Sequence, residues 1–196
     1  MASVNKCTVR SMDKVNTEKK YTRGEIAKVI LKSLLIGGAV ILVLSSPHAT
    51  RIIANYFKGN RRKFMRSVGN LKKSKYINSY YRDGKEMIEI TESGKKRSLQ
   101  YDFEDMKIRT SKSWDGIWRI VTYDISEKRK RGRDQFVIKL KELGFYPYQK
   151  SMFIFPFKCK DEIEFMKEHL FLGDSIHYIE ATRIDDEEVL KKKFGI

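Results

Sequence analysis

The sequence predicts an α+β protein built from two domains of different composition. Helical periodicity and one hairpin fill residues 21–101, whereas strands and helices alternate over residues 114–196. The formal net charge is +16, yet residues 1–113 hold 25 basic and 10 acidic side chains while the remainder holds 16 and 15. Because nearly all the excess positive charge lies in the first half, we expect two domains with different tasks.

The first domain begins after a polar, basic arm. We expect residues 1–20 to be disordered, since they contain no apolar segment that could build a core. Thr22 and Glu25 have the spacing of a capping box, in which the two side chains satisfy backbone amides at a helix N-terminus. Apolar residues then recur at helical spacing over residues 26–35, so a helix begins here.

Two features predict a cytoplasmic protein without a membrane partner. The longest apolar run, Leu34–Leu44, has eleven residues, whereas a membrane-spanning helix needs about 20. Cys7 and Cys159 lie far apart in the chain and form neither a disulfide framework nor a metal-ligand spacing, which fits a reducing compartment. The apolar run is therefore interpreted as a buried helix.

Two more helices are expected in the first domain. Pro47 can open one of them, since proline is favoured at the first helical position. The other covers residues 61–75, and Phe64, Val68 and Leu71 form its apolar stripe. Its remaining positions are hydrogen-bond donors that we expect to face outward: Arg61, Arg62, Lys63, Arg66, Ser67, Asn70 and Lys73.

A hairpin is expected to follow this helix. Residues 76–80 begin a strand, Arg82–Lys85 carries an Asp-Gly turn signal, and residues 87–90 form the returning strand. The segment 91–95 then leads into a short basic helix. Three helices followed by a hairpin is the order of a winged helix-turn-helix domain, and residues 71–96 resemble the end of many such transcription-factor domains.

The charge pattern predicts double-stranded DNA as the partner of this domain. Between Glu25 and Asp83, 57 consecutive positions lack a carboxylate while twelve are Lys or Arg. Such a surface has an uncompensated positive field, and each cation that meets a phosphate releases counterions. A helical bundle with a merely solvated basic face is the alternative. The expected DNA contacts are Arg61, Arg62, Lys63, Arg66, Ser67, Asn70, Lys72, Lys73, Arg82 and Lys85.

The second domain is expected after a polar linker at residues 102–113. Apolar patterning predicts six elements in βαββαβ order, which is the order of a ferredoxin-like fold. These elements are a strand at 118–125, a helix at 129–143, strands at 146–148 and 150–157, a helix from Asp161, and a strand at 175–182.

The second domain also resembles a known family. Its matching pieces are Trp118–Ile125, the cluster Arg129–Arg133, Leu143–Phe145 and Gln149–Phe153. They resemble the C-terminal part of PaaX-type repressors and the second CRISPR-associated protein, the small nuclease-fold partner of the CRISPR integrase. The resemblance implies a homodimer in which two ferredoxin-like sheets pack, and hence a dimeric DNA-binding transcriptional regulator that needs no cofactor.

The same resemblance leaves an enzymatic alternative. Asp124 matches the aspartate at the end of the first strand that is the proposed catalytic residue and Mg²⁺ ligand of the nuclease family. Its other possible roles are to cap the following turn or to pair with Arg129, Arg131 or Arg133. The nuclease pattern has an arginine where this chain has Pro147. The alternatives are therefore a Mg²⁺-dependent CRISPR-associated endonuclease or a non-catalytic adaptation subunit with a CRISPR integrase as partner.

Overall fold

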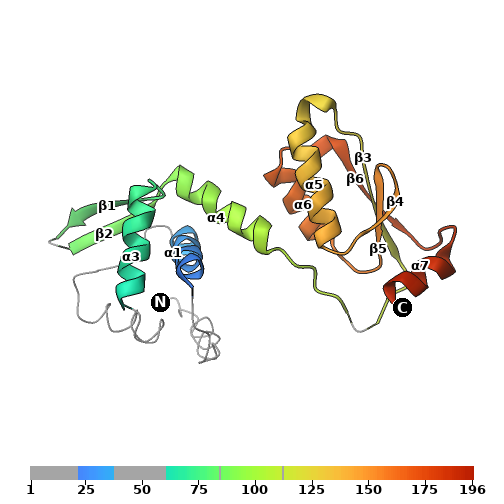
Figure 1. Cartoon of the computed structure of the whole chain (residues 1–196), viewed down its shortest axis with the longest axis horizontal. Helices are drawn as coiled ribbons and strands as arrows, with labels where there is room; N and C mark the ends of the chain where they lie inside the picture. The colour runs from blue at the N-terminus through green and yellow to red at the C-terminus, as the bar shows by residue number, and fades with distance from the viewer. Residues whose placement is uncertain (1–21, 38–60, 84, 112) are drawn as a thin grey trace, which may run out of the picture. The chain divides into compact units, whose positions relative to one another are not determined.

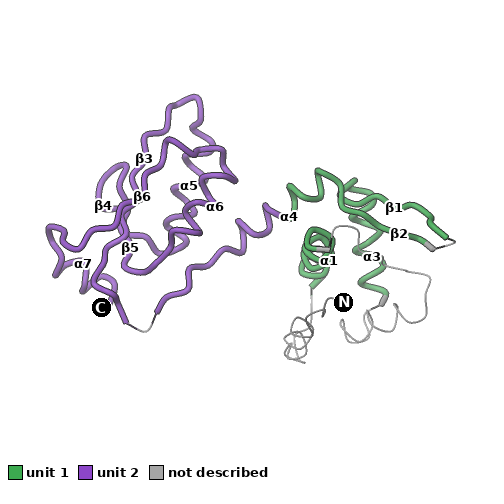
Figure 2. The backbone as a smooth tube through the Cα atoms, turned by 180° about the vertical axis from the view of Figure 1, so that it is seen from behind, with its two compact units in different colours: residues 1–98 green, residues 99–196 purple. Residues whose placement is uncertain are grey.

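The computed structural model describes residues 22–37, 61–83, 85–111 and 113–196. The chain forms two compact units, residues 1–98 and 99–196 (Figure 2). The predicted arm at 1–20 and the predicted helix at Pro47 lie outside the described residues. The described elements of the first half are α1 (Arg23–Gly37), α3 (Arg61–Lys73), β1 (Ile77–Arg82), β2 (Lys85–Ile90) and α4 (Glu92–Asp105).

Helix α1 begins with the predicted capping box. The Thr22 backbone N–H donates to Glu25 Oε2 at 2.7 Å, and the Glu25 backbone N–H donates to Thr22 Oγ1 at 3.3 Å. This reciprocal pair satisfies two amides that would otherwise have no partner in the helix. The helix then buries Ile26, Ile30, Leu31 and Leu34 and packs against α3.

The predicted hairpin is confirmed. Strands β1 and β2 are antiparallel, with Ile77 opposite Ile90 at the base and Arg82 opposite Lys85 at the tip. Helix α4 starts directly after β2, and Thr91 caps it, because its hydroxyl accepts the Gly94 N–H at 3.0 Å. The same hydroxyl donates to the Lys75 carbonyl at 2.7 Å, which ties the start of α4 to the end of α3.

Gly94 lies where the first turn of α4 meets the backbone of the hairpin. A Cβ at this position would lie 2.0 Å from the Tyr76 carbonyl oxygen and 2.8 Å from Ile90 Cγ1. We therefore expect Gly94→Ala to lower the free energy of unfolding by about 1–3 kcal/mol, because backbone must move to make room. Gly69→Ala in α3 is the matched control, since nothing lies within 4 Å of its Cβ.

Chemical denaturation of both variants checks this prediction. The control should be unchanged or more stable by up to about 1 kcal/mol, as expected when alanine replaces glycine inside a helix. Equal stability of Gly94→Ala and the wild type would contradict the close approach of α4 to Tyr76.

The second unit contains the predicted βαββαβ order. Its antiparallel sheet has the strand order β4-β5-β3-β6. Short 3₁₀ turns follow β3 and precede β6, at Glu127–Arg129 and Gly173–Ser175. The elements are β3 (Trp118–Tyr123), α5 (Lys130–Glu142), β4 (Tyr146–Gln149), β5 (Met152–Phe155), α6 (Lys160–His169), β6 (Ile176–Ala181) and α7 (Glu187–Phe194).

Each face of this sheet has its own apolar cluster. Helices α5 and α6 lie on one face (Figure 1), where Phe136 and Ile163 pack with Val121 of the sheet. On the opposite face Leu190 of α7 packs against Trp118 and other strand residues. Helix α7 was not expected from the sequence, because its short, mostly charged sequence has few apolar positions to indicate a helix.

The predicted linker at 102–113 begins inside a helix. Helix α4 continues to Asp105, and Phe103 near its end is only 8% exposed, within the core of the second unit. The Phe103 ring stacks on His169 at 4.8 Å, and the buried Lys139 ammonium donates to the Glu104 carbonyl at 3.0 Å. Met106 and Ile108 of the same stretch also pack against this core, but three apolar residues among many polar ones do not form a clear apolar period.

No helix among the described residues is long and apolar enough to cross a membrane. Most of the apolar run Leu34–Leu44, from residue 38 onward, lies outside that part of the chain.

Candidate nucleic-acid interface

Helix α3 separates an apolar side from a basic side. Phe64, Val68 and Leu71 are 2–4% exposed, so the predicted apolar stripe is confirmed. Ser67 is also buried, at 4% exposed, and the prediction that it faces outward is wrong. Position 67 is three residues after Phe64 and four before Leu71, and this spacing places its side chain on the packed side of the helix.

The opposite side of α3 presents an exposed row of donors. Arg62, Arg66, Asn70 and Lys73 are exposed, and their spacing of four, four and three residues aligns them along one side of the helix. Within the part of the chain that the structure describes, none of these four side chains forms an ion pair or hydrogen bond. We call them the α3 donor row. Lys63 is half-buried beside it.

The end of α3 fixes where the hairpin begins. Lys75 has φ 57° in the left-handed region, and its N–H donates to the Lys72 carbonyl at 2.9 Å. The Tyr76 N–H donates to the Leu71 carbonyl at 3.0 Å. These two bonds form a Schellman motif, which ends the helix and turns the chain into β1.

Lys72 connects α3 to the hairpin. Its ammonium donates to the Glu86 carboxylate on β2, and both side chains are partly buried. Lys72 was predicted as a DNA contact, but its charge is already compensated by Glu86. We therefore interpret this residue as one that holds the helix and the hairpin together.

The hairpin tip carries few described side chains. Arg82 is exposed, and the neighbouring Tyr81 is 77% exposed. The side chains of Arg61 and Lys85, two further predicted DNA contacts, lie outside the described set. Of the predicted contacts, Arg62, Lys63, Arg66, Asn70, Lys73 and Arg82 thus have accessible or half-accessible side chains.

Asp124, the candidate metal ligand, lies in the second unit directly after β3. Its side chain is exposed and its backbone N–H donates to the Ser175 carbonyl at 2.8 Å. It borders an open cleft of about 790 Å³ that also includes Glu127, Arg133 and Lys150. No other described side chain bonds to its carboxylate.

Two of the three arginines that were considered as partners of Asp124, Arg129 and Arg133, have other contacts. Arg133 pairs with Glu127 at 2.5 Å and with Asp134 at 3.5 Å. Arg129 donates to the Phe171 carbonyl and to Ser175 Oγ. Among the described residues, no group of three His, Cys, Asp or Glu side chains is placed to hold a metal ion. Because Mg²⁺ prefers several oxygen ligands in near-octahedral geometry, the donors of one chain do not fit it.

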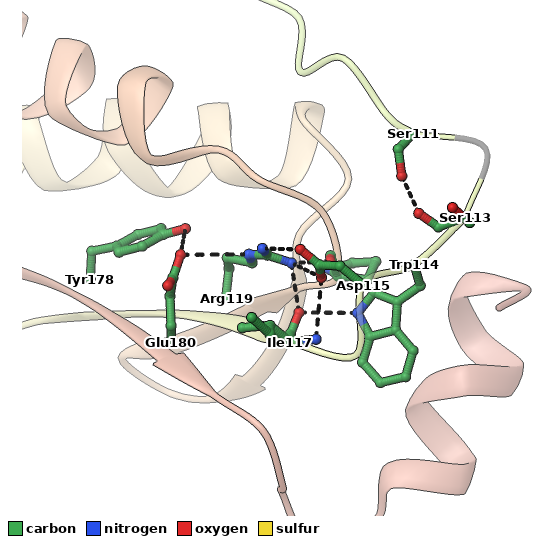
Figure 3. A network of polar contacts seen from close by, with 9 residues as sticks. Ser111, Ser113, Trp114, Asp115, Ile117, Arg119, Tyr178 and Glu180 are labelled. Carbon is green, nitrogen blue, oxygen red and sulfur yellow. Dashed lines mark hydrogen bonds and ion pairs between the residues drawn. The ribbon is translucent and has the colours of Figure 1, made fainter.

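A polar network around Arg119 (Figure 3) was not expected from the sequence. This arginine lies within β3 and is 1% exposed. Its two terminal nitrogens donate to the two Asp115 carboxylate oxygens at 2.6 Å each, and Nη1 also donates to the carbonyls of Ile117 and Pro156 at 2.7 Å. The signal was present in the sequence, as one arginine in an otherwise apolar strand with an aspartate four residues before it.

The network changes the acidity of its carboxylate. The hydrogen bonds from the Arg119 guanidinium lower the pKa of Asp115 from its ordinary value of 3.8 to about 2. Asp115 therefore stays ionised at neutral pH and compensates the buried positive charge.

Comparison with known proteins identifies the second unit. Residues 111–192 match the family model described as the PaaX protein central Cas2-like domain. The match covers β3 to α7 and fits the antiparallel sheet with helices described above. It does not include α1, α3 or the hairpin. No curated protein matches the chain.

Proposed function

Because the chain carries the Cas2-like domain of PaaX-type proteins and so fits a PaaX-like regulator at family level, we propose that it is a dimeric DNA-binding transcriptional regulator. Its first half holds the duplex, and its second half joins two copies. The spacing of the two DNA half-sites then follows from the symmetry of the dimer.

The α3 donor row is the observation that carries this proposal. An α-helix fits the major groove of B-DNA, where arginine binds guanine edges and asparagine binds adenine edges. Arg62, Arg66 and Asn70 supply these donor types on one exposed line, and Lys73 extends it. Arg82 at the hairpin tip adds a cation that can contact the backbone.

A salt titration of duplex binding tests the proposal. If about five phosphates are neutralised per protomer, the logarithm of the association constant should fall with the logarithm of salt concentration with a slope of about −4 to −5 per subunit. Selection of bound DNA from a random pool, with stoichiometry measured on the selected duplex, supplies the sequence and the number of protomers. A slope near zero would refute duplex binding through this surface.

A Mg²⁺-dependent endonuclease is the second candidate function, and the exposed Asp124 beside its cleft favours it. The donors of one chain do not fit the ion, so this function needs the Asp124 carboxylates of two copies, and Mg²⁺-dependent cleavage of DNA should then be lost in the Asp124→Ala variant. The measurement compares both proteins on single- and double-stranded DNA with and without Mg²⁺. Cleavage by the wild type that disappears in Asp124→Ala would establish the nuclease instead.

A further inference from the structure

A second, smaller pocket lies in the Cas2-like unit, away from the Asp124 cleft. It has a volume of about 340 Å³, near the lower limit of pockets that bind small molecules. One wall is the segment that leads from α4 into β3, with Arg109, Ser111 and Ser113. The other wall follows β5 and consists of Phe157 and Lys158. Residues nearly fifty positions apart in the sequence therefore enclose one space.

The base of this pocket is electrically neutral. Arg119 and Asp115 border it. Two hydrogen bonds of 2.6 Å join their side chains, so the two opposite charges neutralise each other. Arg119 also has a second acidic neighbour, because its Nε lies 3.9 Å from the Glu180 carboxylate (Figure 3). Neither of these two charged groups is therefore available to compensate a cation at the rim.

The rim is positively charged. Arg109 and Lys158 are both exposed, and among the described residues neither forms an ion pair or a hydrogen bond through its side chain. Apart from the paired Arg119 and Asp115, the charged residues that line the pocket in the described part of the chain are thus these two cations. Two uncompensated cations facing one space attract an anion.

Hydroxyl groups complete the lining. The Ser111 hydroxyl donates to the Ser113 carbonyl, which orders the segment beside Arg109 (Figure 3). The Ser113 hydroxyl borders the pocket as well. A serine hydroxyl next to a guanidinium and an ammonium can donate to an oxygen of a phosphate or a carboxylate; Ser113 is the residue for this role, because the Ser111 proton is already donated.

From this arrangement we propose that the pocket between Arg109 and Lys158 binds the phosphate or carboxylate group of a small molecule. The bound group joins the segment before β3 to the residues after β5, two walls that are also connected through the Arg119 network. The volume admits a small molecule but not a duplex. The proposal does not depend on DNA binding by the first unit.

The test is a titration of the isotopically labelled full chain followed by NMR. Inorganic phosphate and acetate are added in separate arms at constant ionic strength, with chloride as the balancing salt. We expect the backbone signals of Ser111, Ser113 and Phe157 to shift and saturate with at least one of the two anions, and the arm that responds identifies the group. Replacing both cations, in Arg109→Ala with Lys158→Ala, should weaken this binding by about tenfold or more, since each charge-assisted bond is lost.

The control carries the same loss of charge elsewhere in the unit, in Arg183→Ala with Lys192→Ala, which are exposed residues outside the pocket. It should bind like the wild type. Shifts spread over all basic surfaces, or equal binding by the double variant of the pocket, would overturn the proposal. So would a duplex that shifts the same signals more strongly than either small anion, since the site would then bind nucleic acid.

Discussion

Reversing two charges on helix α3, in Arg62→Glu with Arg66→Glu, is expected to weaken duplex binding on the order of a hundredfold or more. An arginine that contacts a base contributes about 1–3 kcal/mol, and each replacement also places a carboxylate against the phosphates. Both side chains are exposed on the α3 donor row. Their replacement therefore removes contacts without disturbing the buried side that holds the helix in place.

The salt dependence separates this effect from a general loss of charge. Loss of two phosphate or groove contacts in each protomer should make the slope of the salt titration shallower by about two units per protomer. The matched control, Arg183→Glu with Lys192→Glu, reverses two exposed charges in the other unit and should leave affinity and slope nearly unchanged. If the control weakens binding as much as the α3 variant, the protein binds DNA through its net charge alone.

Single replacements then distinguish the two kinds of contact. If Arg62→Ala or Arg66→Ala lowers the affinity for all duplexes by the same factor, the replaced arginine contacts a phosphate. If instead the variant also loses its preference for the selected sequence, the residue contacts a base. Binding is measured by fluorescence anisotropy on the selected duplex and on one scrambled duplex.

Breaking the Arg119 network is expected to produce the largest loss of stability in the second unit. Arg119→Met removes a buried guanidinium with four hydrogen bonds and leaves the carbonyls of Ile117 and Pro156 without this donor. Removal of one partner from a buried pair costs about 3–5 kcal/mol, and we expect a loss in this range from chemical denaturation. Asp115→Asn should cost less, because the Asp115 side chain is 38% exposed and Glu180, 3.9 Å from Arg119 Nε, still compensates part of the buried charge.

The double variant and the pH dependence test the cause. If the Arg119–Asp115 pair causes these losses of stability, the double variant should lose clearly less free energy of unfolding than the sum of the two single variants. The pKa of Asp115 is lowered to about 2 in the folded protein, so its contribution is complete above about pH 4 and is lost as the pH falls toward 2. Asp115→Asn should lack this part of the acid-induced loss. Additive losses with an unchanged acid profile would contradict the pairing.

The sequence predicted the fold where local signals agreed with tertiary packing. The capping box at Thr22 and Glu25 formed because both groups act within one helical turn. The βαββαβ order followed from apolar runs that lie on both faces of a sheet. Helix α7 gave no such signal, since it packs through isolated residues such as Leu190 and Phe194.

The site was predicted less completely, because exposure depends on register. Ser67 is a donor by residue type, but its position in the turn between Phe64 and Leu71 buries it. Lys72 is a cation by type, but Glu86 reaches it from a strand fourteen residues later. Neither outcome follows from residue type or charge counts, since both depend on where the elements meet.

Helix α7 also has a consequence for self-association. Its Leu190 and Phe194 cover Trp118 and Ile154 at one end of the sheet. Helix α7 therefore blocks a second copy of the chain from packing on that end of the face. Among the described residues, the surface of this face that stays accessible lies toward Thr122, Met152 and Ile179.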